Sequence, residues 1–345
     1  MEAEIQSFQI PDHLNAAVPA EKRLNKTRDD VRMLVLGRRT GHRIHDHFYS
    51  LVNYLEAGDV LVLNNSRTIP PVLKGMQNGR VIETRLSRRI SNTCWEAFLP
   101  GKVVSAGEPI QFPGGIKAIA AGKGSEAPLV RLLFSEGGPA LWNMIYKYGE
   151  PVRYEYIDSD LPLDTYQTVY ASVPGSVEMP SAGRAFTWKL LNGLQKKGVK
   201  ITFLQLHAGL SYYENNRWPD PGSRPESYHI PAETAQLINE AREKGKRIIA
   251  AGTTAVRALE TAAARNGTVK AGGGETTLYI HGDYRLKTVD GLLTGFHEPE
   301  ASHLHMLTAF VKEGRLLKTY REALQKGYLW HEFGDMNLIL PEVDQ

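Results

Sequence analysis

The sequence predicts an α/β protein whose mainly parallel sheet, flanked by helices, is interrupted by a small antiparallel β-barrel domain. Strand-like and helix-like segments alternate after residue 160, which is typical of a parallel sheet covered by helices on both faces. From about residue 72 to 134, short alternating segments are separated by Gly, Pro or Ser turns, as in a small barrel or sandwich. We therefore expect a main domain of residues 1–71 and 150–345 and an inserted barrel of residues 72–149.

The segments before residue 150 predict mostly strands. Apolar runs indicate buried strands, whereas strict alternation of apolar and polar residues indicates half-buried ones. The expected strands are Ile5–Ile10, Arg32–Gly37 and Val60–Leu63 in the main domain and Val81–Ser87, Cys94–Leu99, Pro109–Phe112, Ile116–Ala120 and Leu129–Phe134 in the insert, with helices at His45–Ala57 and Gly137–Tyr148.

The second half of the chain predicts alternating helices and strands. Ser181 is expected to cap a helix that Gly198 ends, and Pro231 to open another. A loop as long as His207–Ile230 is unusual unless it is functional or mobile. The expected strands are Val199–Leu206, Thr276–His281, Gly291–Phe296 and Met336–Leu340, the helices are Arg184–Lys197, Pro231–Lys244, Ala301–Val311 and Leu316–Gln325, and Ala271–Gly274 is expected to be a flexible glycine tract.

One strand–turn–helix unit, Lys246–Thr261, stands out as a candidate ligand site. A buried strand at Ile248–Ala251 meets Gly252, and a helix is expected over Ala255–Ala264 with Thr253 and Thr254 as N-cap hydroxyls. Unpaired N–H groups and a partial positive charge at that point suit an anionic or polar group. Arg257 and Glu260 lie three residues apart on the same helix face. The alternative is an ordinary buried βα unit.

Composition excludes several classes of protein. The net charge of +3 permits a nucleic-acid partner without requiring one. A single cysteine, Cys94, excludes an intramolecular disulfide and a cysteine-based metal cluster, and we expect it to be a small buried hydrophobe. The N-terminus lacks the pattern of a signal peptide, and no apolar run approaches the length of about 18 residues that spans a membrane. We therefore expect a cytoplasmic protein.

Four further stretches are rich in polar residues where strands end. They are Asn64–Arg67, Tyr166–Thr187, Leu204–Tyr213 and Asp290–Leu307. Side chains beyond the carboxyl ends of parallel strands are where open α/β sheets bind ligands. The alternatives are a capped turn at Asn64–Arg67, a structural loop at Tyr166–Thr187 and a structural histidine at His207. His303 and His305 lack the spacing of a zinc motif, so we expect no metal site. No motif supports a hydrolase, a nucleoside triphosphatase or a dinucleotide oxidoreductase.

Taken together, these stretches resemble the S-adenosylmethionine:tRNA ribosyltransferase-isomerases of the queuosine pathway. The matching segments occur in the family's order and cover most of the chain outside the insert. They are GDVLVLNNSRTIPPVLKG, YQTVYASVPGSVEMPSAGRAFT, VKITFLQLHAGL, RIIAAGTTAVRALET, YRLKTVDGLLTGFHEP and YREALQKGYLWHEFGDMNLIL. Arg184 and Ala185 depart from the family motif, which has leucine and histidine there.

The resemblance implies a fold in which a small β-barrel interrupts an α/β domain, and an unusual reaction. S-adenosylmethionine is the ribosyl donor and a substrate, with no cofactor, metal or nucleoside triphosphate required. The acceptor is 7-aminomethyl-7-deazaguanine at the wobble position of a tRNA. The product is epoxyqueuosine, and adenine and methionine leave.

This chemistry needs groups that transfer protons near neutral pH. A base removes the ribose proton that the sulfonium acidifies, the acceptor amine must be neutral to attack, and adenine leaves more readily when protonated. We expect His207 and His297 to be catalytic, with Glu260 as carboxylate partner. The expected substrate-binding residues are Asn65, Arg67, Tyr166, Tyr170, Ser181, Gly183, Thr253, Thr254 and Arg257, and tRNA phosphates are expected to meet Arg67, Arg85, Arg88 and Arg89.

Two alternatives remain open at this point. One is a divergent transferase that uses S-adenosylmethionine with a different acceptor. The other is a non-catalytic relative that binds tRNA or a nucleotide. Nothing in the sequence marks a subunit interface, so it predicts no oligomeric state.

Overall fold

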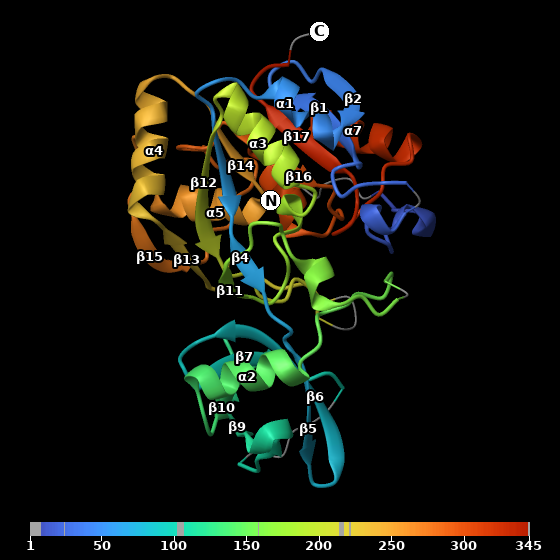
Figure 1. Cartoon of the computed structure of the whole chain (residues 1–345), viewed down its shortest axis with the longest axis vertical. Coiled ribbons are helices and arrows are strands. Elements are labelled where there is room, and N and C mark those ends of the chain that lie inside the picture. The colour runs from blue at the N-terminus through green and yellow to red at the C-terminus, as the bar shows by residue number, and fades with distance from the viewer. Residues whose placement is uncertain are drawn as a thin grey trace.

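The computed structural model describes residues 8–23, 25–101, 107–157, 159–213, 217–220 and 222–343 (Figure 1). Part of the strand expected at Ile5–Ile10 lies outside these ranges, and residues 8–10 form no strand. No helix among the described residues is long and apolar enough to cross a membrane.

The main domain is built on a large mixed sheet. Its strands follow the order β15-β13-β12-β3-β14-β16-β17-β1-β2. The centre, β12-β3-β14-β16, is parallel, whereas β13, β15 and β2 add antiparallel edges and β17 pairs antiparallel with β16. The bounds are β1 Arg32–Gly37, β2 Arg43–His47, β3 Val60–Asn64, β12 Lys200–Leu206, β13 Glu226–Ile230, β14 Ile248–Ala251, β15 Gly272–Thr276, β16 Gly291–Gly295 and β17 Met336–Leu340.

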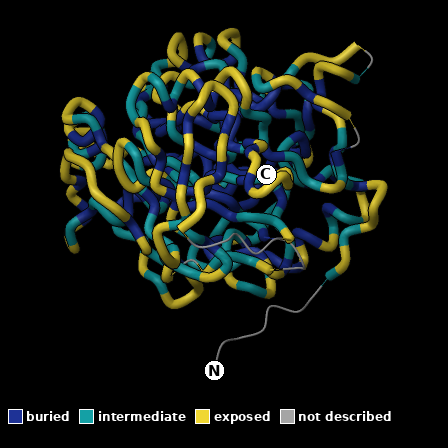
Figure 2. The backbone as a smooth tube through the Cα atoms, turned by 90° about the horizontal axis from the view of Figure 1, so that it is seen from below, coloured by how far each residue is buried: buried dark blue, intermediate teal, exposed yellow. Residues whose placement is uncertain are grey.

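Helices cover both faces of this sheet, which explains the continuous apolar runs of its central strands. In β3, Val60 and Val62 point into one hydrophobic core, while Leu61 and Leu63 point into the other. Figure 2 shows buried segments, in dark blue, in the interior of the molecule. The helices α4 (Ala232–Glu243), α5 (Thr253–Ala262), α6 (Ser302–Thr308) and α7 (Glu313–Gln325) contribute to the first core, and α1 (Leu51–Tyr54) and α3 (Trp188–Lys197) to the second.

The insert is a closed antiparallel barrel, so the predicted fold class is confirmed. The barrel lies below the main domain in Figure 1 and is reached through β4 (Ser66–Thr68), which pairs with β11 (Val173–Ser176). We propose that the inserted domain spans residues 72–149. Its strands are β5 Val72–Gln77, β6 Arg80–Arg89, β7 Cys94–Phe98, β8 Ile110–Gln111, β9 Lys117–Lys123 and β10 Val130–Phe134, and α2 (Gly138–Tyr148) packs against them.

Several local predictions were wrong because tertiary contacts override local patterns. The helix expected at His45–Ala57 begins as β2, which pairs with β1, and only Leu51–Tyr54 is α-helical. Part of the expected loop His207–Ile230 is strand β13, and the glycine tract begins β15, because the two pair with each other. Residues 277–281 form no strand.

Two further corrections concern single residues. Helix α3 begins at Trp188 rather than Arg184, because the Thr187 hydroxyl accepts a hydrogen bond from the Leu190 N–H at 3.1 Å and caps the helix there. Gly198 ends the helix with φ 97°, as predicted. Cys94 is only partly buried on β7.

Candidate active site

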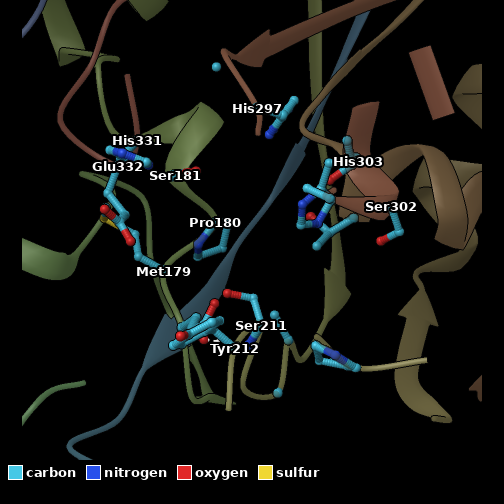
Figure 3. A pocket seen from close by; sticks show the side chains of 18 of the residues that line it. Met179, Pro180, Ser181, Ser211, Tyr212, His297, Ser302, His303, His331 and Glu332 are labelled. Atoms are coloured by element: carbon cyan, nitrogen blue, oxygen red, sulfur yellow. Dashed lines mark hydrogen bonds between the residues drawn. The ribbon is translucent and has the colours of Figure 1, made fainter. Parts of the chain in front are cut away.

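A cavity of about 640 Å³ lies at the carboxyl end of the central strands. Its walls come from the segments that follow β12, β14 and β16 and from two segments of the main domain near the barrel, residues 151–156 and 177–182. Figure 3 shows His297 and His303 on one side and His331 and Glu332 across from them. The volume falls within the range of small-molecule sites, and the place is the one where open α/β sheets bind ligands.

The N-terminus of α5 forms one end of the cavity. Gly252, with φ 97°, is its N-cap residue, and neither threonine hydroxyl caps the helix, so the predicted capping role of Thr253 and Thr254 was wrong. Both threonines nevertheless line the cavity. Because a side chain with a Cβ rarely adopts this φ, glycine lets the chain turn directly from strand into helix. The first turn of the helix, whose N–H groups have no partners within the helix, thus lies at the cavity.

A buried ion-pair cluster forms a second part of the wall. The Glu226 carboxylate accepts from the Arg257 guanidinium, lies 3.3 Å from Nη2 of Arg224 and accepts from the Gly209 N–H at 3.2 Å. Burial alone would raise the pKa of Glu226, but the charges of Arg257 and Arg224 outweigh it and hold the pKa below its usual range. Arg257 also donates to the Leu278 carbonyl at 3.1 Å, which fixes its orientation.

Two histidines lie together after β16. His297 Nε2 is 2.7 Å from the Thr294 hydroxyl, and its ring centroid is 5.1 Å from that of His303. Burial, with a smaller contribution from His303, lowers the pKa of His297 to about 3. Burial also lowers the pKa of His303. Both imidazoles are therefore neutral at physiological pH.

The opposite wall holds two tyrosine–carboxylate pairs that sequence reasoning missed. Tyr154 donates a hydrogen bond to Glu178, and Tyr156 donates one to Glu332. Burial raises the pKa of Glu178 to about 7, and it also raises the pKa of Glu332. The only sequence signal was the alternation in RYEYI, residues 153–157. These residues form a turn, closed by a hydrogen bond from the Ile157 N–H to the Tyr154 carbonyl at 3.0 Å, and the two tyrosine rings stack with centroids 5.9 Å apart.

The structure brings together about half of the predicted site residues. Those that line the cavity are Tyr166, Ser181, Thr253, Thr254, Arg257 and His297. Those that lie outside its lining are His207, Glu260, Asn65, Arg67, Tyr170 and Gly183.

Glu260, predicted to be a carboxylate partner in catalysis, lies outside the lining of the cavity, and its hydrogen bonds indicate a structural role. It is fully buried on α5 and accepts hydrogen bonds from the backbone N–H groups of Lys287, Thr288 and Val289 at 2.8–3.1 Å, and from the Tyr284 hydroxyl at 3.2 Å. Although Glu260 lies three residues from Arg257 on α5, only Arg257 lines the cavity. The Glu260 oxygens are saturated by the chain that leads into β16.

His207 lies behind the cavity wall rather than in it. Its Nδ1 is 2.7 Å from the Ser66 hydroxyl, and its ring packs so closely on Gly175 that a Cβ there would lie 2.5 Å from Nδ1. Burial, followed by the charge of Arg89, lowers the pKa of His207. The next residues, Ala208 and Gly209, do line the cavity.

The other displaced residues have clear structural partners. Tyr170 is buried in the second core against Phe186 and Phe203. Asn65, which follows β3, donates a hydrogen bond to the Ser172 hydroxyl at 3.1 Å and accepts one from the Gln205 side chain at 2.7 Å. Gly183 lies directly beside Tyr170, because a Cβ added at Gly183 would lie 2.0 Å from the Tyr170 hydroxyl oxygen.

Of the basic residues predicted to contact tRNA, one lines the cavity and the others lie outside its lining. Arg85 lines the cavity, whereas Arg67 and Arg89 are exposed. Arg88 joins the barrel to β15 through ion pairs with Glu96 and Glu275. The departure Arg184 is buried, pairs with Glu21 and lies over the Phe333 ring. Among the described residues, no group of three His, Cys, Asp or Glu side chains is arranged to hold a metal ion.

The fold and the cavity together define an α/β protein with a cavity at its strand ends and an inserted barrel. The sequence model of the family described as queuosine biosynthesis protein matches residues 4–339. The chain belongs to this family.

Relatives of known name match over their whole length. The S-adenosylmethionine:tRNA ribosyltransferase-isomerase of Thermoanaerobacter sp. (strain X514) is 37% identical, with 96% of this chain and 98% of that protein covered. The protein of the same name from Staphylococcus haemolyticus (strain JCSC1435) is 36% identical, with 99% and 100% covered. The crystal structure of S-adenosylmethionine tRNA ribosyltransferase from Thermotoga maritima aligns with a TM-score of 0.57 at 32% identity, covering 98% of this chain and 100% of that one.

Replacing Glu260 by glutamine tests its structural role. The amide nitrogen would face backbone donors in place of a carboxylate oxygen, so we expect the free energy of unfolding to fall by about 3 kcal/mol. Urea unfolding measures this change. Glu243→Gln, an exposed carboxylate-to-amide change at the end of α4, serves as the control and should be neutral. An unfolding free energy equal to that of the parent protein would contradict the assignment.

Proposed function

We propose that this chain transfers and isomerises the ribosyl moiety of S-adenosylmethionine onto 7-aminomethyl-7-deazaguanine at the tRNA wobble position. The products are epoxyqueuosine in tRNA, adenine and methionine. The observation that carries the proposal is the cavity at the strand ends, in which a helix N-terminus, a neutral histidine pair and half-buried carboxylates face one another in a chain of the queuosine biosynthesis family. Relatives that match over their full length have names that describe this reaction.

S-adenosylmethionine fits this cavity as a substrate, and we propose that the enzyme uses no further cofactor. The methionine carboxylate is placed at the N-terminus of α5, where the N–H groups near Thr253 and Thr254 are directed towards it. Tyr166 lines the same cavity and offers an aromatic face to adenine. Arg257 acts mainly by holding Glu226, because three of its donors already have partners.

His297 enters the reaction as a neutral imidazole. At neutral pH it carries no imidazolium proton to give, and its low pKa makes it a weak base, so we assign it hydrogen bonding at the reacting ribose rather than proton transfer. His207 has no place in this scheme, because it lies behind the cavity wall.

The tRNA is proposed to approach from the side where the barrel meets the main domain. Arg85 of β6 lines the cavity there, and Arg67 and Arg89 are exposed near the junction. Contacts of such residues with phosphates make binding weaker as the salt concentration rises. A tRNA substrate also supports a cytoplasmic location.

Adenine release tests the proposed function. Incubation with S-adenosylmethionine and tRNA that carries 7-aminomethyl-7-deazaguanine should release one adenine per modified nucleoside formed, measured by chromatography and nucleoside mass spectrometry. Release of adenine without a change in the tRNA would favour a different acceptor. Intact tRNA binding without any adenine release would favour a non-catalytic relative.

Replacing His297 by alanine should lower kcat by roughly 100-fold, the scale of a lost hydrogen bond to the reacting group. His297→Asn keeps a neutral hydrogen-bonding group and should restore part of the activity. Because the pKa of His297 is about 3, its charge does not change between pH 5 and 8, and the shape of the pH–rate profile in that range should be unaltered. The loss of an ionisation from this range in His297→Ala would contradict the assignment.

A further inference from the structure

One wall of the cavity has carboxylates but no arginine or lysine paired with them among the described residues. It is formed by Tyr154, Tyr156, Glu178, Ser211 and Glu332. The Glu178 carboxylate accepts from the Tyr154 hydroxyl and from the Ser211 N–H at 2.6 Å. Within the described part of the chain, neither Glu178 nor Glu332 forms an ion pair with lysine or arginine, whereas Glu226 across the cavity contacts two arginines. A carboxylate withdrawn from water without a cation is costly, so this wall favours a cation or a proton.

The geometry of the wall selects the kind of cation. The Tyr154 hydroxyl oxygen lies 2.8 Å from that of Ser211, so three oxygens, including that of Glu178, converge at one place. The rings of Tyr154 and Tyr156 stack with centroids 5.9 Å apart, and His331 stacks on Tyr156 at 4.1 Å. Aromatic faces attract cations. Converging oxygens suit an ammonium group, which donates hydrogen bonds, better than a sulfonium, which has no hydrogen to donate.

The position of the wall indicates which substrate brings that ammonium. Tyr154 packs in a small cluster with Phe98 of β7 and Leu129 from the barrel, together with Leu210 and Tyr213 of the main domain. This is the barrel side of the cavity. The N-terminus of α5, to which we assign the methionine carboxylate, belongs to the main sheet.

We propose that Glu178 is a catalytic residue that binds the protonated aminomethyl group of the acceptor nucleoside and accepts its proton, with Tyr154 as a positioning residue; this inference rests on the proposed function. One N–H bond of the ammonium breaks and its electron pair stays on nitrogen. The proton forms an O–H bond with the Glu178 carboxylate. The neutral amine then has the lone pair that it needs to attack the ribosyl unit.

The groups that face Glu178 set the pH range of this step. Tyr154 and Ser211 donate hydrogen bonds to the Glu178 carboxylate. The negative charge of Glu332 repels it, and the positive charge of Arg224 attracts it. Burial is the largest influence and, against the hydrogen bonds, leaves the pKa of Glu178 at about 7. The carboxylate that must accept the proton is thus present above about pH 7, and kcat/KM for tRNA should rise through this value.

Binding of two tRNAs tests the inference without requiring turnover. The dissociation constants of tRNA with 7-aminomethyl-7-deazaguanine and of the same tRNA with guanine at the wobble position are measured for the parent protein, Glu178→Gln and the surface control Glu243→Gln. The parent protein and the control should prefer the aminomethyl form by at least tenfold. Glu178→Gln should lose this preference and still bind S-adenosylmethionine within threefold of the parent affinity, which shows that the cavity is intact.

Turnover provides the second readout. Glu178→Gln should lower kcat/KM for tRNA by at least about 100-fold and abolish its rise near pH 7, the effect of losing a proton-transfer group. Tyr154→Phe should move the rise to higher pH, because the lost hydrogen bond had stabilised the carboxylate.

Three outcomes separate this inference from the proposed function. If the parent enzyme turns over and Glu178→Gln keeps both its tRNA preference and its rate, the inference is overturned and the proposed function stands. If the variant instead raises KM for S-adenosylmethionine alone, the inference is overturned, because the carboxylate then holds the amino group of the donor. The third outcome is a parent protein that releases no adenine but prefers the aminomethyl tRNA, together with a Glu178→Gln variant that lacks this preference. The proposed function then fails, and recognition of the amine by Glu178 is supported.

Discussion

The candidate site depends on the buried side-chain amide of Asn64, which locks three segments together where the central strands end. Its Nδ2 donates to the Leu206 carbonyl at 2.9 Å and to the Thr254 hydroxyl at 3.1 Å, while its Oδ1 accepts from the N–H groups of Leu206 and Ser66. One side chain thus fixes the ends of β3 and β12 and the start of α5. Without this amide, the buried backbone groups of Leu206 and Ser66 would lose hydrogen-bond partners. The segments that follow β3 and β12 and the start of α5 would then no longer be held in fixed positions relative to one another.

Around this fixed point the cavity has two chemically different sides. On the sheet side, Glu226 is neutralised by Arg224 and Arg257, so its charge is constant and it serves to hold its neighbours. On the barrel side, Glu178 accepts hydrogen bonds but forms no ion pair with lysine or arginine among the described residues, and burial raises its pKa to about 7. Fixed charges position a substrate, whereas titrating groups move protons. The barrel insertion therefore does more than extend the molecule, because it packs against the segment that carries Tyr154.

Sequence patterns predicted the fold better than the site, for a physical reason. Strands such as Ile248–Ala251 are buried on both faces, so their apolar runs report the sheet directly. His207 and Glu260 lie outside the cavity because each has hydrogen-bond partners from distant parts of the chain, Ser66 for His207 and residues 287–289 for Glu260. Only the assembled fold brings these partners together. Tyr154 and Glu178 were missed because they are 24 residues apart and meet only after the chain has returned from the barrel.

The most direct test of the account is a crystal structure of the protein with S-adenosylhomocysteine, a stable analogue of the proposed donor. We expect the amino-acid carboxylate at the N-terminus of α5, the sulfur and ribose facing His297, and the Tyr154–Glu178 side left open for the acceptor amine. An analogue bound outside this cavity, or one whose amino group occupies the oxygens of Glu178, would contradict the account.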